Sequence, residues 1–269
     1  MDTTTESQKP DSSSAATRAL KLLAILSLLA GVGIGLYSLA AVLGVWFGMW
    51  GFRTGAGMLR TVNDSAVWVI GFSLVVAIVV FFMARRLNMK NAARLTTFAV
   101  TGAMVATIAF VVPLTYSPAE GTPAIHDITT NTDNPPQFIA IAPLRADAPN
   151  NMVYGEQENW DKQSMAAAQH KAYPDIVPQE FTEPKAEVFN RALAAANELG
   201  WEVVAQDPAT GRIEATDTTF WFRFKDDIVI EVTETAQGSV LNARSLSRVG
   251  TSDVGKNADR LREFFNQLD

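Results

Sequence analysis

The sequence predicts a two-part protein: an all-α membrane region of three transmembrane helices, followed by an extracytoplasmic α+β domain. The first half contains three long stretches that are almost free of charged residues, whereas the second half contains short alternating apolar runs. The charge also changes sign between the halves. Up to Tyr116, nine Lys or Arg residues stand against four acids, a net of +5; from Ser117 onward, thirteen stand against twenty-four, a net of −11.

The three apolar stretches lie at residues 20–46, 66–84 and 95–116, within a membrane region predicted at 18–116. Each has about the 20 residues that a helix needs to cross the hydrocarbon core of a bilayer. The segment 1–17 is rich in Ser and Thr and lacks apolar periodicity, which predicts a disordered tail.

Basic residues set the predicted orientation. Arg18 and Lys21 lie at the start of the first stretch, and four further bases lie between residues 85 and 94, around the connection of the second and third stretches. The positive-inside rule places both groups, and the N-terminus, in the cytoplasm and the C-terminal domain outside it. Residues 38–40 also resemble a signal-peptide cleavage site, and cleavage there would leave the same topology.

The second half is predicted to be a linker, 117–149, and a domain, 150–269. Apolar spacing predicts a helix over 184–199 and a second helix whose N-cap is Ser252. Strands are predicted at 201–206, 212–217, 219–225, 228–234 and 239–247. Their short connections favour an antiparallel meander packed by two helices, which by analogy is similar to a helix-grip fold.

Several stretches of this half carry a resemblance to a known family. They are His126–Thr130, Pro135–Phe138, Ala172–Asp175, Ile213–Asp217, Phe220–Phe222 and Arg244–Asp253. From about His126 to the C-terminus, the chain resembles the domain of unknown function 1499 family. The resemblance implies a bacterial envelope protein with one intact domain, hence the bacterial cytoplasmic (inner) membrane, and it implies no catalytic residues.

The main candidate site lies between the last strand and the last helix. Its residues are Arg244, Ser245, Arg248, Gly250, Ser252, Asp253, Asn257 and Arg260. A glycine loop that enters a helix N-terminus offers free N–H groups to a carboxylate or phosphate, and arginines add bidentate donors. The alternative is structural: Ser252 and Asp253 cap the helix, while Arg244 and Arg248 pair with Asp217 or with linker acids.

Four further residues are candidates. Asp217 and Trp221 are added to the ligand site, although such a Trp also packs readily under a helix or a linker. His126 and Asp127 form a candidate His–carboxylate pair for metal binding or proton transfer, with a structural or solvated role as the alternative. The chain has no Cys, Walker loop or hydrolase motif, so no catalytic residue, metal or cofactor is predicted.

The favoured function is a non-enzymatic, membrane-anchored envelope protein whose domain binds a lipid-like or anionic ligand or a partner protein. One alternative is a hydrolase or transferase acting on envelope glycan or lipid, with Asp217 or Asp253 as the carboxylate and His126 near it. Another is a signalling or assembly subunit of a membrane complex.

The predicted partners follow from composition. The lipid bilayer is one, and glycine-rich helix faces, including the Gly44–Gly48 spacing, favour close helix contact with a partner or a second copy. The acidic domain argues against a broad nucleic-acid role, because phosphate binding requires a concentrated basic face, and no nucleic-acid partner is predicted.

Overall fold

The computed structural model describes residues 12–114 and 119–268, which belong to two compact units divided between Tyr116 and Ser117. Residues 1–11 of the predicted tail lie outside the described residues. The remainder of that tail begins the first helix.

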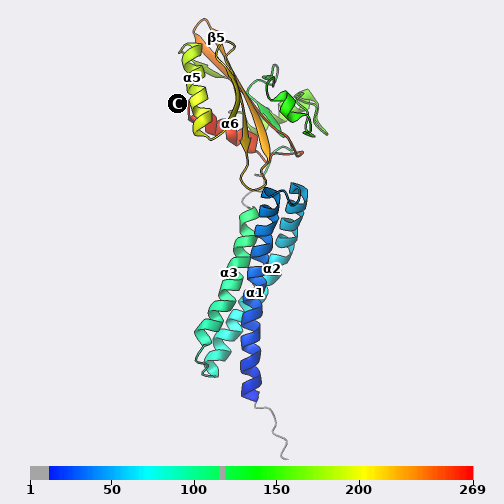
Figure 1. Ribbon diagram of the computed structural model, residues 1–269, viewed down its shortest axis with the longest axis vertical. Helices are drawn as coiled ribbons and strands as arrows, with labels where there is room; N and C mark the ends of the chain where they lie inside the picture. The colour runs from blue at the N-terminus through cyan, green and yellow to red at the C-terminus, as the bar shows by residue number, and fades with distance from the viewer. Residues whose placement is uncertain (1–11, 115–118, 269) are drawn as a thin grey trace, which may run out of the picture. The chain divides into compact units, whose positions relative to one another are not determined.

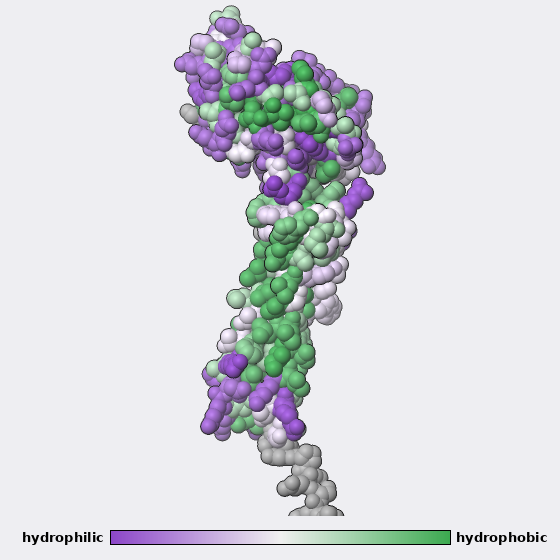
Figure 2. Space-filling model, viewed as in Figure 1, coloured by the Kyte–Doolittle hydropathy of each residue, from purple (hydrophilic) through white to green (hydrophobic). Residues whose placement is uncertain are grey.

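The first unit consists of three long helices: α1 (Ser12–Trp46), α2 (Phe52–Arg86) and α3 (Ala92–Leu114), shown in Figure 1. All three are long and apolar enough to cross a membrane. Hydrophobic residues cover most of the helical surface that is visible in Figure 2. The prediction of three apolar helices is therefore confirmed.

The helices begin earlier than the apolar stretches. α2 starts at Phe52, well before residue 66, so Arg53 and Arg60, which lie between the first two apolar stretches, belong to the helix. The buried Val62 and Ala66 continue one packed face of α2 across this boundary. An apolar stretch indicates only the part of a helix that suits the hydrocarbon core of a bilayer. The helix itself can extend further, where its side chains pack against neighbouring helices.

Two glycines bring α1 and α3 into backbone contact. A Cβ added to Gly31 would lie 2.1 Å from the carbonyl oxygen of Gly102, and one added to Gly102 would lie 2.3 Å from the carbonyl oxygen of Ser27. The Ser27 hydroxyl donates a hydrogen bond to the carbonyl of Ala99 across the same interface, at 3.3 Å. Small residues permit this approach where lipid supplies no hydrophobic driving force.

The second unit is built around a six-stranded antiparallel sheet. Its strands are β1 (Asp127–Thr129), β2 (Gln179–Phe181), β3 (Glu202–Asp207), β4 (Arg212–Thr218), β5 (Lys225–Thr235) and β6 (Gly238–Ser247). The order is β1-β6-β5-β4-β3, and β2 also pairs with β6. The helices are a 3-10 turn, η1 (Ala142–Arg145), and α4 (Lys162–Ala172), α5 (Lys185–Glu198) and α6 (Lys256–Asn266). The predicted antiparallel sheet with helices is confirmed.

Both faces of the sheet are covered. Along β5, Ile228 and Ile230 point into the main core with α5 and α6, whereas Val229 between them points to the other face. That second face is covered by Phe138 and Ile141, both of which lie just before η1 in the sequence. This two-residue alternation is the period of a strand whose faces are both buried.

The segment predicted as a linker, 117–149, contributes to the folded unit. It supplies β1 and η1, and Ile125 and Ile128 are fully buried in the main core. Outside β1 and η1 its described backbone is irregular, which suits its Pro, Asn and Asp content. Irregular backbone can nevertheless cover a sheet, because polar turns leave the intervening apolar residues free to pack.

The strand predicted at 219–225 is wrong. Thr219 and Phe224 close a connection between β4 and β5: the Thr219 N–H donates to the Phe224 carbonyl, and the Phe224 N–H donates to the Thr219 hydroxyl. Arg223 has a φ of 55°, which a strand excludes. Asp226 and Asp227, which lie between two of the predicted strands, belong to β5.

Candidate ligand-binding site

Most of the predicted site residues gather at one end of the sheet. There β4 and β6 end and β5 begins, because Asp217 pairs with Asp226, and Asp226 pairs with Ser247. α6 packs beside this end through its contacts with β6 and β1. Residues distant in sequence therefore share one polar cluster.

Arg260 of α6 is the centre of that cluster, and its side chain is almost completely buried. Its Nε lies 2.9 Å from Oδ2 of Asp217, and its Nη2 lies 2.6 Å from Oδ2 of Asp226. Its Nη1 donates to Asn257 at 2.6 Å and to Ser245 at 3.2 Å. Two carboxylates thus compensate one buried guanidinium, which leaves the group with a net negative charge.

Arg244 and Arg248 are also paired within the domain. Both carboxylate oxygens of Asp127 accept from Arg244, at 2.9 and 2.7 Å, and Arg244 is fully buried. Arg248 donates to both oxygens of Asp227, at 2.9 and 2.8 Å. Asp227 also accepts from Arg145 at 2.5 Å. These contacts match the structural alternative, except that the partner of Arg248 is Asp227 and not Asp217.

The start of α6 differs from the prediction. The helix begins at Lys256, and its N-cap is Gly255 with a φ of 88°, not Ser252. The Ser252 hydroxyl accepts from the N–H of Val254, at 3.1 Å, and not from a helical N–H group of the described residues. A left-handed residue just before a helix suits glycine, and sequence periodicity does not reveal it.

Asp253 satisfies the first N–H groups of this helix from outside it. Its carboxylate accepts from the Gly255 N–H at 2.8 Å and from the Asn257 N–H at 2.7 Å. Burial raises the pKa of Asp253 to about 6, although these two hydrogen bonds act in the opposite direction. The chain's own carboxylate therefore occupies the position at which an external anion was predicted, and Gly250 lies in the preceding loop.

His126 lies within the same end of the domain and is 6% exposed. Its Nδ1 has no hydrogen-bond partner among the described residues. Burial lowers the pKa of His126, while the nearby Asp127 acts to raise it. Both Asp127 oxygens accept from Arg244, and no hydrogen bond joins His126 to Asp127 among the described residues.

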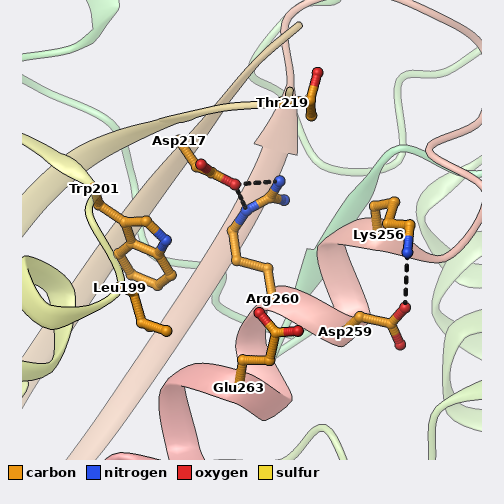
Figure 3. Close-up of a pocket in the computed structure, with 8 residues that line it drawn as sticks. All are labelled: Leu199, Trp201, Asp217, Thr219, Lys256, Asp259, Arg260 and Glu263. Carbon is orange, nitrogen blue, oxygen red and sulfur yellow. Dashed lines mark hydrogen bonds and ion pairs between the residues drawn. The ribbon is translucent and has the colours of Figure 1, made fainter. Parts of the chain in front are cut away.

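A surface depression opens next to Arg260, between α6 and the start of β3 (Figure 3). Its lining residues are Leu199, Trp201, Asp217, Thr219, Lys256, Asp259, Arg260 and Glu263, and its volume is about 310 Å³. Charged groups of both signs thus surround it.

Three charged residues of this lining were not predicted from the sequence: Lys256, Asp259 and Glu263. They follow one another at spacings of three and four residues, which places them on one face of α6. This spacing is the sequence pattern that could have indicated a shared site. Lys256 and Asp259 form an exposed pair at 3.6 Å. Trp221, which was predicted as a site residue, lies in the β4–β5 connection and does not line the depression.

The described chain thus combines three helices that are long and apolar enough to cross a membrane with an antiparallel α+β domain. Residues 127–268 match the family model described as "Protein of unknown function (DUF1499)". The chain belongs to this family, as its resemblance from about His126 onward predicted. No curated protein matches the chain.

Proposed function

We propose that the chain is a non-enzymatic protein of the bacterial cytoplasmic membrane whose extracytoplasmic domain binds the polar head of a lipid-like ligand. The observation that carries this proposal is the depression beside α6, whose walls hold charged groups of both signs. The helix and the sheet would hold the ligand between them, in the manner of a helix-grip fold but with polar walls.

The available charges favour a zwitterionic head group. Arg260 is buried and compensated by Asp217 and Asp226, whereas Lys256 is exposed and its pair with Asp259 is long, at 3.6 Å. We therefore assign Lys256 to the phosphate. Glu263 is exposed and makes no ion pair within the described residues, which makes it the partner for an ammonium group. A volume of about 310 Å³ lies at the lower end of ligand pockets and suits a head group without its acyl chains.

The arginine-rich junction is not part of this proposed site. Arg244 and Arg248 donate to carboxylates of their own domain, and the Asp253 carboxylate occupies the N–H groups at the start of α6. An added anion there would have to displace a bound carboxylate. The structural reading of these residues is therefore the one that the contacts favour.

The membrane placement rests on charge. Bases cluster around the α2–α3 connection, at Arg85, Arg86, Lys90 and Arg94, and this pattern marks a cytoplasmic connection. Since α3 is the last of the three spans, the domain that follows it would lie on the opposite, extracytoplasmic side.

Titration of the detergent-solubilised full-length protein with glycerophosphoethanolamine tests the head-group proposal. We expect saturable binding by calorimetry, and several-fold weaker binding for Lys256→Gln and for Glu263→Gln, because each removes one charge that the zwitterion needs. Glu234→Gln is the matched control: it removes an exposed acid near the opposite end of β5. Absence of binding, or equal weakening by all three variants, would refute the proposal.

The other functions predicted from the sequence remain hypotheses. For a hydrolase or transferase, Asp217 and Asp253 were the candidate carboxylates, and both are engaged by Arg260 or by backbone N–H groups. For a signalling or assembly subunit, no contact among the described residues argues for or against the role. Binding of the head group in the titration would support neither of these two alternatives over the other.

A further inference from the structure

The connection between β4 and β5 has an unusual composition for an acidic domain. We name residues 219–225, which are this connection and Lys225, the first residue of β5, the aromatic loop. It contains Phe220, Trp221, Phe222 and Phe224 together with two bases. The bases are Arg223 and Lys225, and both are exposed. The part of the chain from Ser117 onward otherwise carries an excess of acids.

The aromatic rings are not hidden in the domain core. Phe220 is 63% exposed, and its ring packs edge-on against Trp221 at 5.2 Å. Phe222 and Phe224 are half-buried and lie 5.7 Å apart. None of these rings belongs to the main core cluster. Rings beside bases are the composition of segments that settle at the boundary between lipid tails and head groups.

The aromatic loop lies at the end of the sheet where the chain enters the domain. Asp127, the first residue of β1, pairs with Leu246, and Leu246 pairs with Asp227 at the start of β5. Two strand spacings, or about 10 Å, therefore separate the entry point from the strand that begins at the loop. The exposed Leu144, whose carbonyl accepts from Arg248 just after β6, adds an apolar side chain near this end.

The entry point is tethered to the membrane by a short connection. Twelve residues, 115–126, separate the end of α3 from the start of β1. A fully extended chain of this length spans about 40 Å. The end of the sheet that carries the aromatic loop is thus the end that the covalent chain holds within reach of the bilayer.

We propose that the aromatic loop inserts into the interfacial layer of the same bilayer that α1, α2 and α3 cross. The exposed ring of Phe220 would lie among acyl chains, and Arg223 and Lys225 would lie among the lipid phosphates. The loop is a second membrane attachment, and it is independent of whether the depression beside α6 binds a head group.

The absence of native cysteine makes a direct test possible. Full-length Phe220→Cys is labelled with an environment-sensitive fluorophore and reconstituted into vesicles of phosphatidylethanolamine and phosphatidylglycerol that contain head-group-proximal nitroxide lipids. The control is Gln237→Cys, exposed in the β5–β6 turn at the far end of β5, about 35 Å away along the strand. Lys225→Cys repeats the measurement without removing a ring.

We expect the nitroxide lipids to quench the labels at 220 and 225 several-fold more strongly than the label at 237. Equal quenching at all three positions would overturn the proposal. So would labels at 220 and 225 that are shielded from aqueous iodide but not quenched by lipid, because that result means that protein covers the loop.

Discussion

Arg244 is the largest of the fully buried side chains among the described residues, and it holds Asp127 by two hydrogen bonds. It also donates to the carbonyls of Pro136 and Met152, so one guanidinium joins β6 to β1 and to the irregular covering segment. Such a pair stabilises through its complete hydrogen bonding, and breaking it by removing one partner leaves a buried charge unpaired.

We predict that Arg244→Ala lowers the stability of the domain by about 3–5 kcal/mol, because the Asp127 carboxylate is left buried without its cation. Thermal unfolding of the full-length protein in detergent, followed by near-ultraviolet circular dichroism, measures the change. Arg262→Ala is the control: Arg262 pairs with Asp175 on the surface, and exposed pairs contribute at most about 1 kcal/mol. Similar losses from the two substitutions would contradict the assignment.

For single residues, the sequence pointed to the arginines of the candidate site but did not identify their ion-pair partners. Arg244, Arg248 and Arg260 were all recognised as a group, but their partners are Asp127, Asp227 and Asp226. A guanidinium that binds a ligand and one that binds its own domain have the same sequence pattern. Only the strand register, which brings distant carboxylates to the arginines, distinguishes the two.

Among the elements, α1 and α3 depend on the approach of Gly31 and Gly102. We predict that Gly31→Val separates these helices and lowers the thermal midpoint of the solubilised protein, since its Cβ would overlap the Gly102 backbone. Gly33→Val is the matched control, because a Cβ at Gly33 meets nothing within 4 Å. If Gly33→Val destabilised the protein as strongly as Gly31→Val, the glycine contact would not be the cause.

Element boundaries show where sequence patterns reach their limit. The helix at 185–198 and the hairpin of β3 and β4 follow the predicted periodicity closely, since the apolar spacing and the Asp207–Gly211 turn are local signals. Alternation also suggested a strand across the aromatic loop, where Arg223 instead adopts a left-handed backbone. β1 and β2 have three residues each, too few for a periodic pattern to appear.

For the whole molecule, topology is the property to test. We predict that a membrane-impermeant maleimide labels Gln237→Cys in intact spheroplasts, whereas Asn88→Cys, in the α2–α3 connection, reacts only after permeabilisation. The reason is the cluster of bases around residue 88, which the positive-inside rule assigns to the cytoplasm. Both sites are exposed, and the chain has no other cysteine. The reverse labelling pattern would place the domain in the cytoplasm.

The pairing of β1 with β6 joins the first strand of the domain to its last. Asp127 pairs with Leu246, and β2 occupies the same edge of β6 at Ser239–Leu241. The sheet therefore has a high contact order. The chain between β1 and β6 must lose the entropy of loop closure before the pairing of the two strands stabilises the fold. During synthesis, β1 and β2 must wait unpaired until β6 emerges, so the domain completes its sheet only when nearly the whole chain is available.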